Sequence, residues 1–179
     1  MDYETRPPRR GLLPELSAQF RNHIARVEYV VFTRADCRLA WKIFSDIKLW
    51  PQFCDLYTGL RWQGTPWRPG SRLRMELKDP VNAVVDRVVT VCMPPNHLAW
   101  INHVLGYTME QWIAFEPYSG GGTRVATWIE VTGAELSKRG GDDIRYLKTI
   151  VSTWFDNFSA ECDRADDALH VDDIPSAAD

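Results

Sequence analysis

His103 is the residue best suited to move protons, because histidine is the side chain whose ordinary pKa lies closest to neutral pH. Tyr107 follows it four residues later, across a short turn at positions 105–106. A two-residue turn would pair Val104 with Tyr107 and place His103 on the outer face of a sheet. A three-residue turn would pair His103 with Tyr107 and bring both inside. Both registers are open at this point.

Asp86 is the second candidate for acid–base chemistry, and Arg87 follows it within a run of valines. Successive side chains of a strand point to opposite faces, so only one of the two points inward. An inward Asp86 would be a pocket acid. The commoner outcome is a structural ion pair with a neighbouring strand.

Other kinds of chemistry lack support in the sequence. No nucleophile elbow, paired carboxylates on one helix face or Ser/His/Asp arrangement is present, so hydrolase chemistry is not indicated. The run Ser119–Gly122 lacks the phosphate-loop pattern and leads into a strand, which favours a hairpin turn. The four cysteines are scattered and no histidine stands at zinc-ligand spacing, so we expect buried free thiols and no metal.

The elements that would position these residues begin with a strand over Val27–Thr33, which is rich in β-branched and aromatic residues. Asp36 stands at the N-cap position of a short helix, whose apolar positions are Leu39, Ile43 and Phe44. Pro51 disfavours the helical conformation for Trp50, so this helix cannot run far beyond position 49.

Several antiparallel strands follow. Leu73, Met75 and Leu77 alternate with charged residues in 71–78, which predicts one buried face. Further strands are expected over 81–93 and 97–103, separated by a turn at 94–96. A five-residue loop over 118–122 would pair Pro117 with Thr123, and Trp112 would then face Trp128.

The chain changes period after position 142. Apolar residues at steps of three and four predict one buried stripe of a helix five or six turns long: Leu147, Val151, Trp154, Phe158 and Cys162. Gly140 and Gly141 are expected to precede the helix, with Asp142 or Asp143 as its cap. A helix packed on an antiparallel sheet is an α+β arrangement.

These features together resemble a known superfamily. A strand, a helix, a D-x-x-x-W-P-x-F turn over 46–53 and R-P-G at 68–70 are similar to the START/Bet v 1-like (SRPBCC) superfamily, most closely its polyketide cyclase/dehydrase and lipid-transport branch. The resemblance covers about residues 25–165. It implies a helix-grip fold, in which a curved antiparallel sheet wraps around a long C-terminal helix with an apolar cavity between them.

The resemblance also implies which side chains line that cavity. The expected ligand-binding residues are Leu73, Met75, Leu77, Trp100, Met109, Gln111, Ile113, Phe115, Val125, Thr127, Ile129, Leu147, Val151 and Trp154. Gln111 and Thr127 are polar on an otherwise apolar face, so each must bond to a neighbour, a water or a ligand. The alternative is a mutually satisfied pair in the core.

Length and charge suit one compact domain. We expect an N-terminal extension over 1–25, a ligand-binding domain over 26–168 and an acidic disordered tail over 169–179. The first residues contain no long apolar run, which favours a cytoplasmic protein without a signal peptide or membrane span. The net charge of −3 is not typical of a nucleic-acid-binding surface.

The paired Trp112 and Trp128 should lie on the sheet face away from the long helix. Leu16, Phe20 and Ile24 form a helical stripe that could cover them, a homodimer through this face would do the same, and scattered exposed tryptophans are the plain alternative.

Three functions remain open. The first is binding of a hydrophobic small molecule, namely a lipid, polyketide or aromatic compound, without a cofactor. The second is a cofactor-free polyketide cyclase, aromatase or dehydratase that uses the same cavity, with His103 or Asp86 as catalytic residues. The third is an interaction protein that uses the sheet face that carries Trp112 and Trp128, which we call the tryptophan face.

Overall fold

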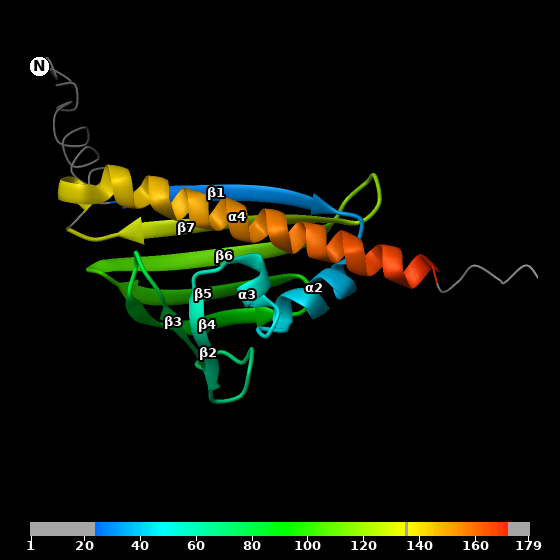
Figure 1. Ribbon diagram of the computed structural model, residues 1–179, viewed down its shortest axis with the longest axis horizontal. Coiled ribbons are helices and arrows are strands. Elements are labelled where there is room, and N and C mark those ends of the chain that lie inside the picture. Colours follow the sequence, from blue (N-terminus) through cyan, green and yellow to red (C-terminus); the bar gives the residue numbers. More distant parts are fainter. Residues whose placement is uncertain (1–23, 135, 172–179) are drawn as a thin grey trace, which may run out of the picture.

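A seven-stranded antiparallel sheet curves around one long helix in the computed structural model, which describes residues 24–134 and 136–171 (Figure 1). The elements in chain order are β1 (Ile24–Thr33), α2 (Cys37–Ser45), α3 (Trp50–Phe53), β2 (Tyr57–Gln63), β3 (Arg72–Leu77), β4 (Ala83–Met93), β5 (His97–Val104), β6 (Tyr107–Pro117), β7 (Thr123–Thr132) and α4 (Leu136–Val171). The strand order is β1-β7-β6-β5-β4-β3-β2. The predicted α+β helix-grip fold is confirmed.

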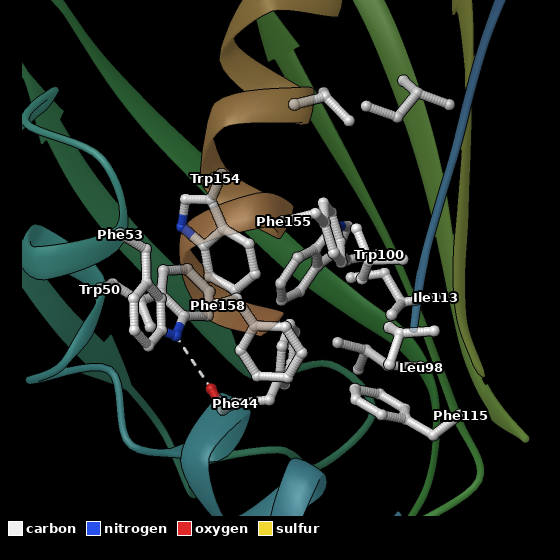
Figure 2. Packing of buried hydrophobic residues seen from close by; sticks show 14 of the residues in the cluster. Phe44, Trp50, Phe53, Leu98, Trp100, Ile113, Phe115, Trp154, Phe155 and Phe158 are labelled. Atoms are coloured by element: carbon white, nitrogen blue, oxygen red, sulfur yellow. Dashed lines mark hydrogen bonds between the residues drawn. The ribbon is translucent and has the colours of Figure 1, made fainter. Parts of the chain in front are cut away.

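The two short helices close one end of the space between the sheet and α4 (Figure 1). Asp36 caps α2 as predicted, because its Oδ1 accepts a hydrogen bond from the Leu39 amide at 2.8 Å. A second short helix, α3, begins at Trp50 with Pro51 in its first turn, where proline costs no hydrogen bond. The Trp50 indole N–H donates to the Phe44 carbonyl oxygen at 2.9 Å and so fixes α3 against α2 (Figure 2).

The β6–β7 hairpin has the predicted register. Pro117 pairs with Thr123, and Trp112 pairs with Trp128. The two indoles stack on the outer face with ring centroids 5.9 Å apart and planes 4° from parallel. Both remain half-buried, and the Arg26 guanidinium lies 5.9 Å from the Trp128 ring.

The long helix α4 begins earlier than its sequence indicates. It starts at Leu136, so the prediction of a start after Asp142 is wrong, and the two glycines at 140–141 lie inside the helix. Glycine costs about 1 kcal/mol in a helix interior relative to alanine, which packing can offset. Asp142 and Asp143 therefore do not cap the helix: Asp142 pairs with Arg145, and Asp143 accepts a hydrogen bond from Tyr107.

The predicted apolar stripe of α4 does face the sheet. Val151, Trp154, Phe158 and Cys162 are buried, and Leu147 is half-buried. Side chains also tie α4 to β1, because the Tyr29 hydroxyl donates to Asp156 at 2.8 Å. The other three cysteines are half-buried free thiols.

Ile24, the last residue of the predicted N-terminal stripe, is the first residue of β1. Leu16 and Phe20 lie outside the described residues. None of the helices in residues 24–134 and 136–171 is both long and apolar enough to cross a membrane.

Candidate functional site

Two adjoining chambers lie between the sheet and α4. The inner chamber has a volume of about 50 Å³ and the outer one about 150 Å³. They share four lining residues, namely Tyr57, Arg87, Leu147 and Ile150. These four side chains form the boundary between the chambers, which we call the neck.

Aromatic side chains enclose the inner chamber. Phe44, Trp50, Trp100, Trp154 and Phe155 all line it and are all buried (Figure 2). Phe44 stacks on Trp100, and the other ring pairs meet at tilted or edge-to-face angles, over centroid distances near 5 to 6 Å. Dense aromatic packing explains why this chamber is small.

The outer chamber is mostly aliphatic. Its walls come from β2 to β6, the loops that precede β2 and β4, and the first half of α4, and include Leu56, Met75, Leu77, Val81, Val85, Val104, Met109, Leu147 and Ile150. The exposed Leu105 and Tyr146 also line it, so the chamber reaches the surface between the β5–β6 turn and α4. Its polar lining includes Asn102 and the Tyr107 hydroxyl, which donates to Asp143 at 2.6 Å.

Arg87 is the charged residue at the neck. It lies opposite Leu73 of β3, on the cavity face of β4, while Asp86 points the other way. Its Nε is buried without a hydrogen-bond partner, and its Cζ lies 4.6 Å from the centroid of the Trp100 ring. Arg87 is half-buried and lines both chambers, so the part of its surface that remains accessible faces the cavity.

Tyr57 accompanies Arg87 at the neck. Burial raises the pKa of Tyr57 to about 12, while the positive charge of Arg87 acts in the opposite direction. At neutral pH its phenol is therefore protonated and able to donate a hydrogen bond into the cavity. Burial lowers the pKa of Arg87, but arginine starts so far above neutral pH that the guanidinium keeps its charge.

A chain of buried hydrogen bonds holds the ring beneath Arg87. The Trp100 indole N–H donates to Gln111 Oε1 at 2.9 Å, and Gln111 Nε2 donates to Thr127 Oγ1 at 2.9 Å. The Thr127 hydroxyl donates in turn to the Trp112 carbonyl oxygen at 2.9 Å. Gln111 and Thr127 thus satisfy each other, as the core-pair alternative predicted, and they fix the plane on which Arg87 rests.

Replacing Gln111 with leucine tests this chain. The Gln111→Leu variant leaves the Trp100 indole N–H buried without an acceptor, so we expect the free energy of unfolding to fall by about 1–2 kcal/mol. Urea denaturation followed by circular dichroism measures the change. Gln111→Glu keeps an acceptor for Trp100 but buries a carboxyl group, so this variant should recover stability as the pH falls and the carboxyl becomes protonated. Equal stability of Gln111→Leu and wild type would contradict the role of the chain.

Most of the expected cavity residues line one of the two chambers. The exceptions are Leu73, Phe115, Val125 and Thr127, which face inward but line neither chamber because neighbouring side chains fill the space around them. The sequence did not indicate that Arg87, Tyr57, Asn102 and Phe44 also line the chambers. Alternation along β4 showed that one of Asp86 and Arg87 faces inward, but gave no sign of which.

His103 and Asp86 both project from the outer face of the sheet. The β5–β6 turn has two residues, with Val104 paired to Tyr107, and the exposed His103 ring is hydrogen-bonded to Thr108 Oγ1 at 2.9 Å. Asp86 forms an ion pair with Arg74 of the neighbouring strand, 3.5 Å between Oδ2 and Nη1. Neither borders either chamber, so chemistry inside the cavity loses both candidates.

Solved structures share this architecture. The di-domain ARO/CYC StfQ from the steffimycin biosynthetic pathway aligns with a TM-score of 0.69 and 14% identity, over 84% of this chain and 54% of StfQ. Ara h 8.0201 aligns with a TM-score of 0.66 and 10% identity, over 78% of this chain and 97% of that one. The chain has the Bet v 1-like helix-grip fold.

A third similar structure is norcoclaurine synthase from Thalictrum flavum in complex with dopamine and hydroxybenzaldehyde, with a TM-score of 0.60 and 11% identity over 89% of this chain and 95% of that one. This chain spans about half the length of StfQ. No family model and no curated protein matches the sequence. At these identities the likeness concerns the helix-grip fold, and function must come from the site.

Proposed function

We propose that the protein binds a hydrophobic small molecule, namely a lipid, polyketide or aromatic compound, in the cavity between its sheet and α4. The outer chamber carries this proposal, because about 150 Å³ of apolar space reaches the surface in an interior that is otherwise densely packed. An engineered cavity of about that volume in another protein stays dry and binds benzene. Burial of apolar ligand surface supplies the affinity.

Neighbouring valines of β4 allow a matched test. Val85 lines the outer chamber and is 2% exposed, whereas Val84 points outward and is 53% exposed. Native mass spectrometry of the freshly purified protein, with organic extraction, should find one apolar molecule per chain, or uptake of one from a mixed hydrophobic library. Val85→Trp should lose this binding by filling the chamber, at a cost in stability of about 1–3 kcal/mol from overpacking. Val84→Trp should retain it.

Two outcomes would overturn the binding function. One is an empty wild-type mass with no uptake from the library. The other is a folded Val85→Trp variant that binds as well as Val84→Trp. Either would favour a packed interior and direct attention to the tryptophan face.

A second candidate function is cofactor-free cyclisation, aromatisation or dehydration of a polyketide-type chain. The likeness to StfQ supports it at the level of the fold, and the Tyr107–Asp143 hydrogen bond places a phenol and a carboxylate at the outer chamber. Incubation with a poly-β-carbonyl thioester separates the two functions. Recovery of the unchanged compound supports binding, and a cyclised product that has lost water supports catalysis.

The tryptophan face supports the third, weaker alternative. Trp112 and Trp128 form a half-buried stack on the outer sheet face, as an interaction surface or homodimer would require. The dimer stays a prediction, and size-exclusion chromatography with light scattering tests it.

A further inference from the structure

Arg87 places a positive charge where the cavity is otherwise apolar. Its neighbours at the neck are Tyr57, Leu147 and Ile150, and Trp100 lies beneath its guanidinium. A charged side chain in such surroundings loses its hydration, and natural proteins compensate with a carboxylate or several acceptors. The question is therefore whether a carboxylate of the protein already pairs with Arg87.

No carboxylate of the described residues is ion-paired with Arg87. Asp86, next in sequence, is on the opposite face and pairs with Arg74. Asp143 lines the outer chamber and accepts a hydrogen bond from the Tyr107 hydroxyl at 2.6 Å, but it forms no ion pair with Arg87. The Tyr57 phenol at the same neck is protonated and neutral at physiological pH, so it does not balance the charge of Arg87. The guanidinium thus lies over the Trp100 ring, and its buried Nε donor has no hydrogen-bond partner.

A ligand carboxylate would complete this environment. Arginine offers several donors in a planar fork that matches a carboxylate with two parallel hydrogen bonds, and such charge-assisted bonds are among the strongest in proteins. Tyr57 adds a protonated hydroxyl at the same neck. The Trp100–Gln111–Thr127 chain holds the supporting ring in place, so the site is organised before a ligand arrives.

The outer chamber determines the rest of the ligand. Its walls are mostly aliphatic, and its volume of about 150 Å³ suits a single ring or a short chain. A ligand that entered past Leu105 and Tyr146 would meet the apolar walls first and Arg87 at the far end. Its tail would then lie toward the surface and its polar end at the neck.

We propose that the cavity selects a small hydrophobic carboxylate, whose carboxylate group pairs with Arg87 at the neck and whose apolar tail fills the outer chamber. This rests on the binding function proposed above and adds the charge of the ligand. Carboxylates are chosen over neutral lipids because a neutral ligand would leave the guanidinium unmatched. The inner aromatic chamber stays behind Arg87 and adds little room.

Isothermal titration calorimetry with octanoate and 1-octanol at pH 7.5 tests the proposal, because the two probes share a chain length and differ in charge. Wild type should bind octanoate at least tenfold more tightly than 1-octanol. Arg87→Met should lose at least tenfold in octanoate affinity and keep its 1-octanol affinity within about threefold. Arg87→Lys, which keeps the charge without the fork, should fall between them. Arg72→Met, on the exposed outer face of β3, is the matched control and should behave as wild type.

The outcomes separate this proposal from the binding function. Equal wild-type affinity for both probes, or full octanoate affinity in Arg87→Met, would overturn the role of Arg87 and leave the hydrophobic cavity standing. Binding of 1-octanol alone would do the same. Failure to bind either probe would overturn the small carboxylate, and the extraction experiment with the Val84 and Val85 variants then decides whether the cavity binds anything.

Discussion

Replacing Phe44 with alanine is expected to destabilise the protein by about 3–5 kcal/mol, the usual cost of deleting a fully buried phenylalanine ring. Phe44 is 1% exposed and joins α2 to both other layers. Its ring centroid lies 5.4 Å from that of Phe115 on the sheet and 5.7 Å from that of Trp154 on α4 (Figure 2). No single neighbour can move into the gap without leaving the others, so much of the cavity would persist.

Urea denaturation followed by far-ultraviolet circular dichroism measures this loss, since several tryptophans surround the site and would complicate fluorescence. Phe32→Ala is the matched control, because Phe32 is 52% exposed at the outer edge of β1. It should change the free energy of unfolding by less than about 1 kcal/mol, as surface substitutions generally do. A Phe44→Ala variant as stable as Phe32→Ala would mean that the aromatic cluster is not the centre of the core.

The β6–β7 hairpin shows what sequence reasoning can settle. The length of the loop and the cross-strand partners pointed to one register, because that register paired Glu116 with Arg124 and Trp112 with Trp128. A shift by one residue would have placed the apolar side chains of the two strands on opposite faces of the sheet. Where turn length and facing agree in this way, the register follows from the residues alone.

The facing of Arg87 could not be obtained in the same way. The ladder between β4 and β5 is interrupted between Val89 and Val91, so the alternation of faces changes at this bulge. From Val85, every second residue points inward as far as Arg87 and Val89. Continued past the bulge, this alternation would make Val91 and Met93 the inward residues, but it is Cys92 that pairs with the buried Leu98. The sequence contains no mark of the bulge, and so no mark of which residue of the 86–87 pair enters the cavity.

The β5–β6 turn was undecided for a related reason. A two-residue hairpin of this kind needs positive φ at both central positions, which asparagine and glycine adopt more readily than leucine. Gly106 has φ of 82°, as expected of glycine, but Leu105 also has φ of 52°. Packing of Leu105 at the mouth of the outer chamber accompanies this unusual conformation, and only the folded structure reveals it.

Replacing Arg87 with methionine is expected to raise the free energy of unfolding of the ligand-free protein by about 1–3 kcal/mol, because an unpaired buried charge gives way to an apolar side chain of similar length. The lost contact between the guanidinium and Trp100 offsets part of this gain, about 0.5–2 kcal/mol. Methionine is flexible enough to lie over the same indole and contact it through its sulfur. Chemical denaturation of ligand-stripped protein measures the difference, and Arg72→Met should stay within about 0.5 kcal/mol of wild type.

This gain in stability is what links Arg87 to function. A side chain that is expected to lower the stability of the empty protein, and that has no ion-pair partner among the described residues, contributes something that stability does not measure. A bound carboxylate would raise the free energy of unfolding of the wild type, because it binds the folded state, and would do little for Arg87→Met. Adding octanoate should therefore narrow or invert the stability difference between the two proteins. A methionine variant that is less stable than wild type by 1 kcal/mol or more without ligand would show that the guanidinium already serves the fold.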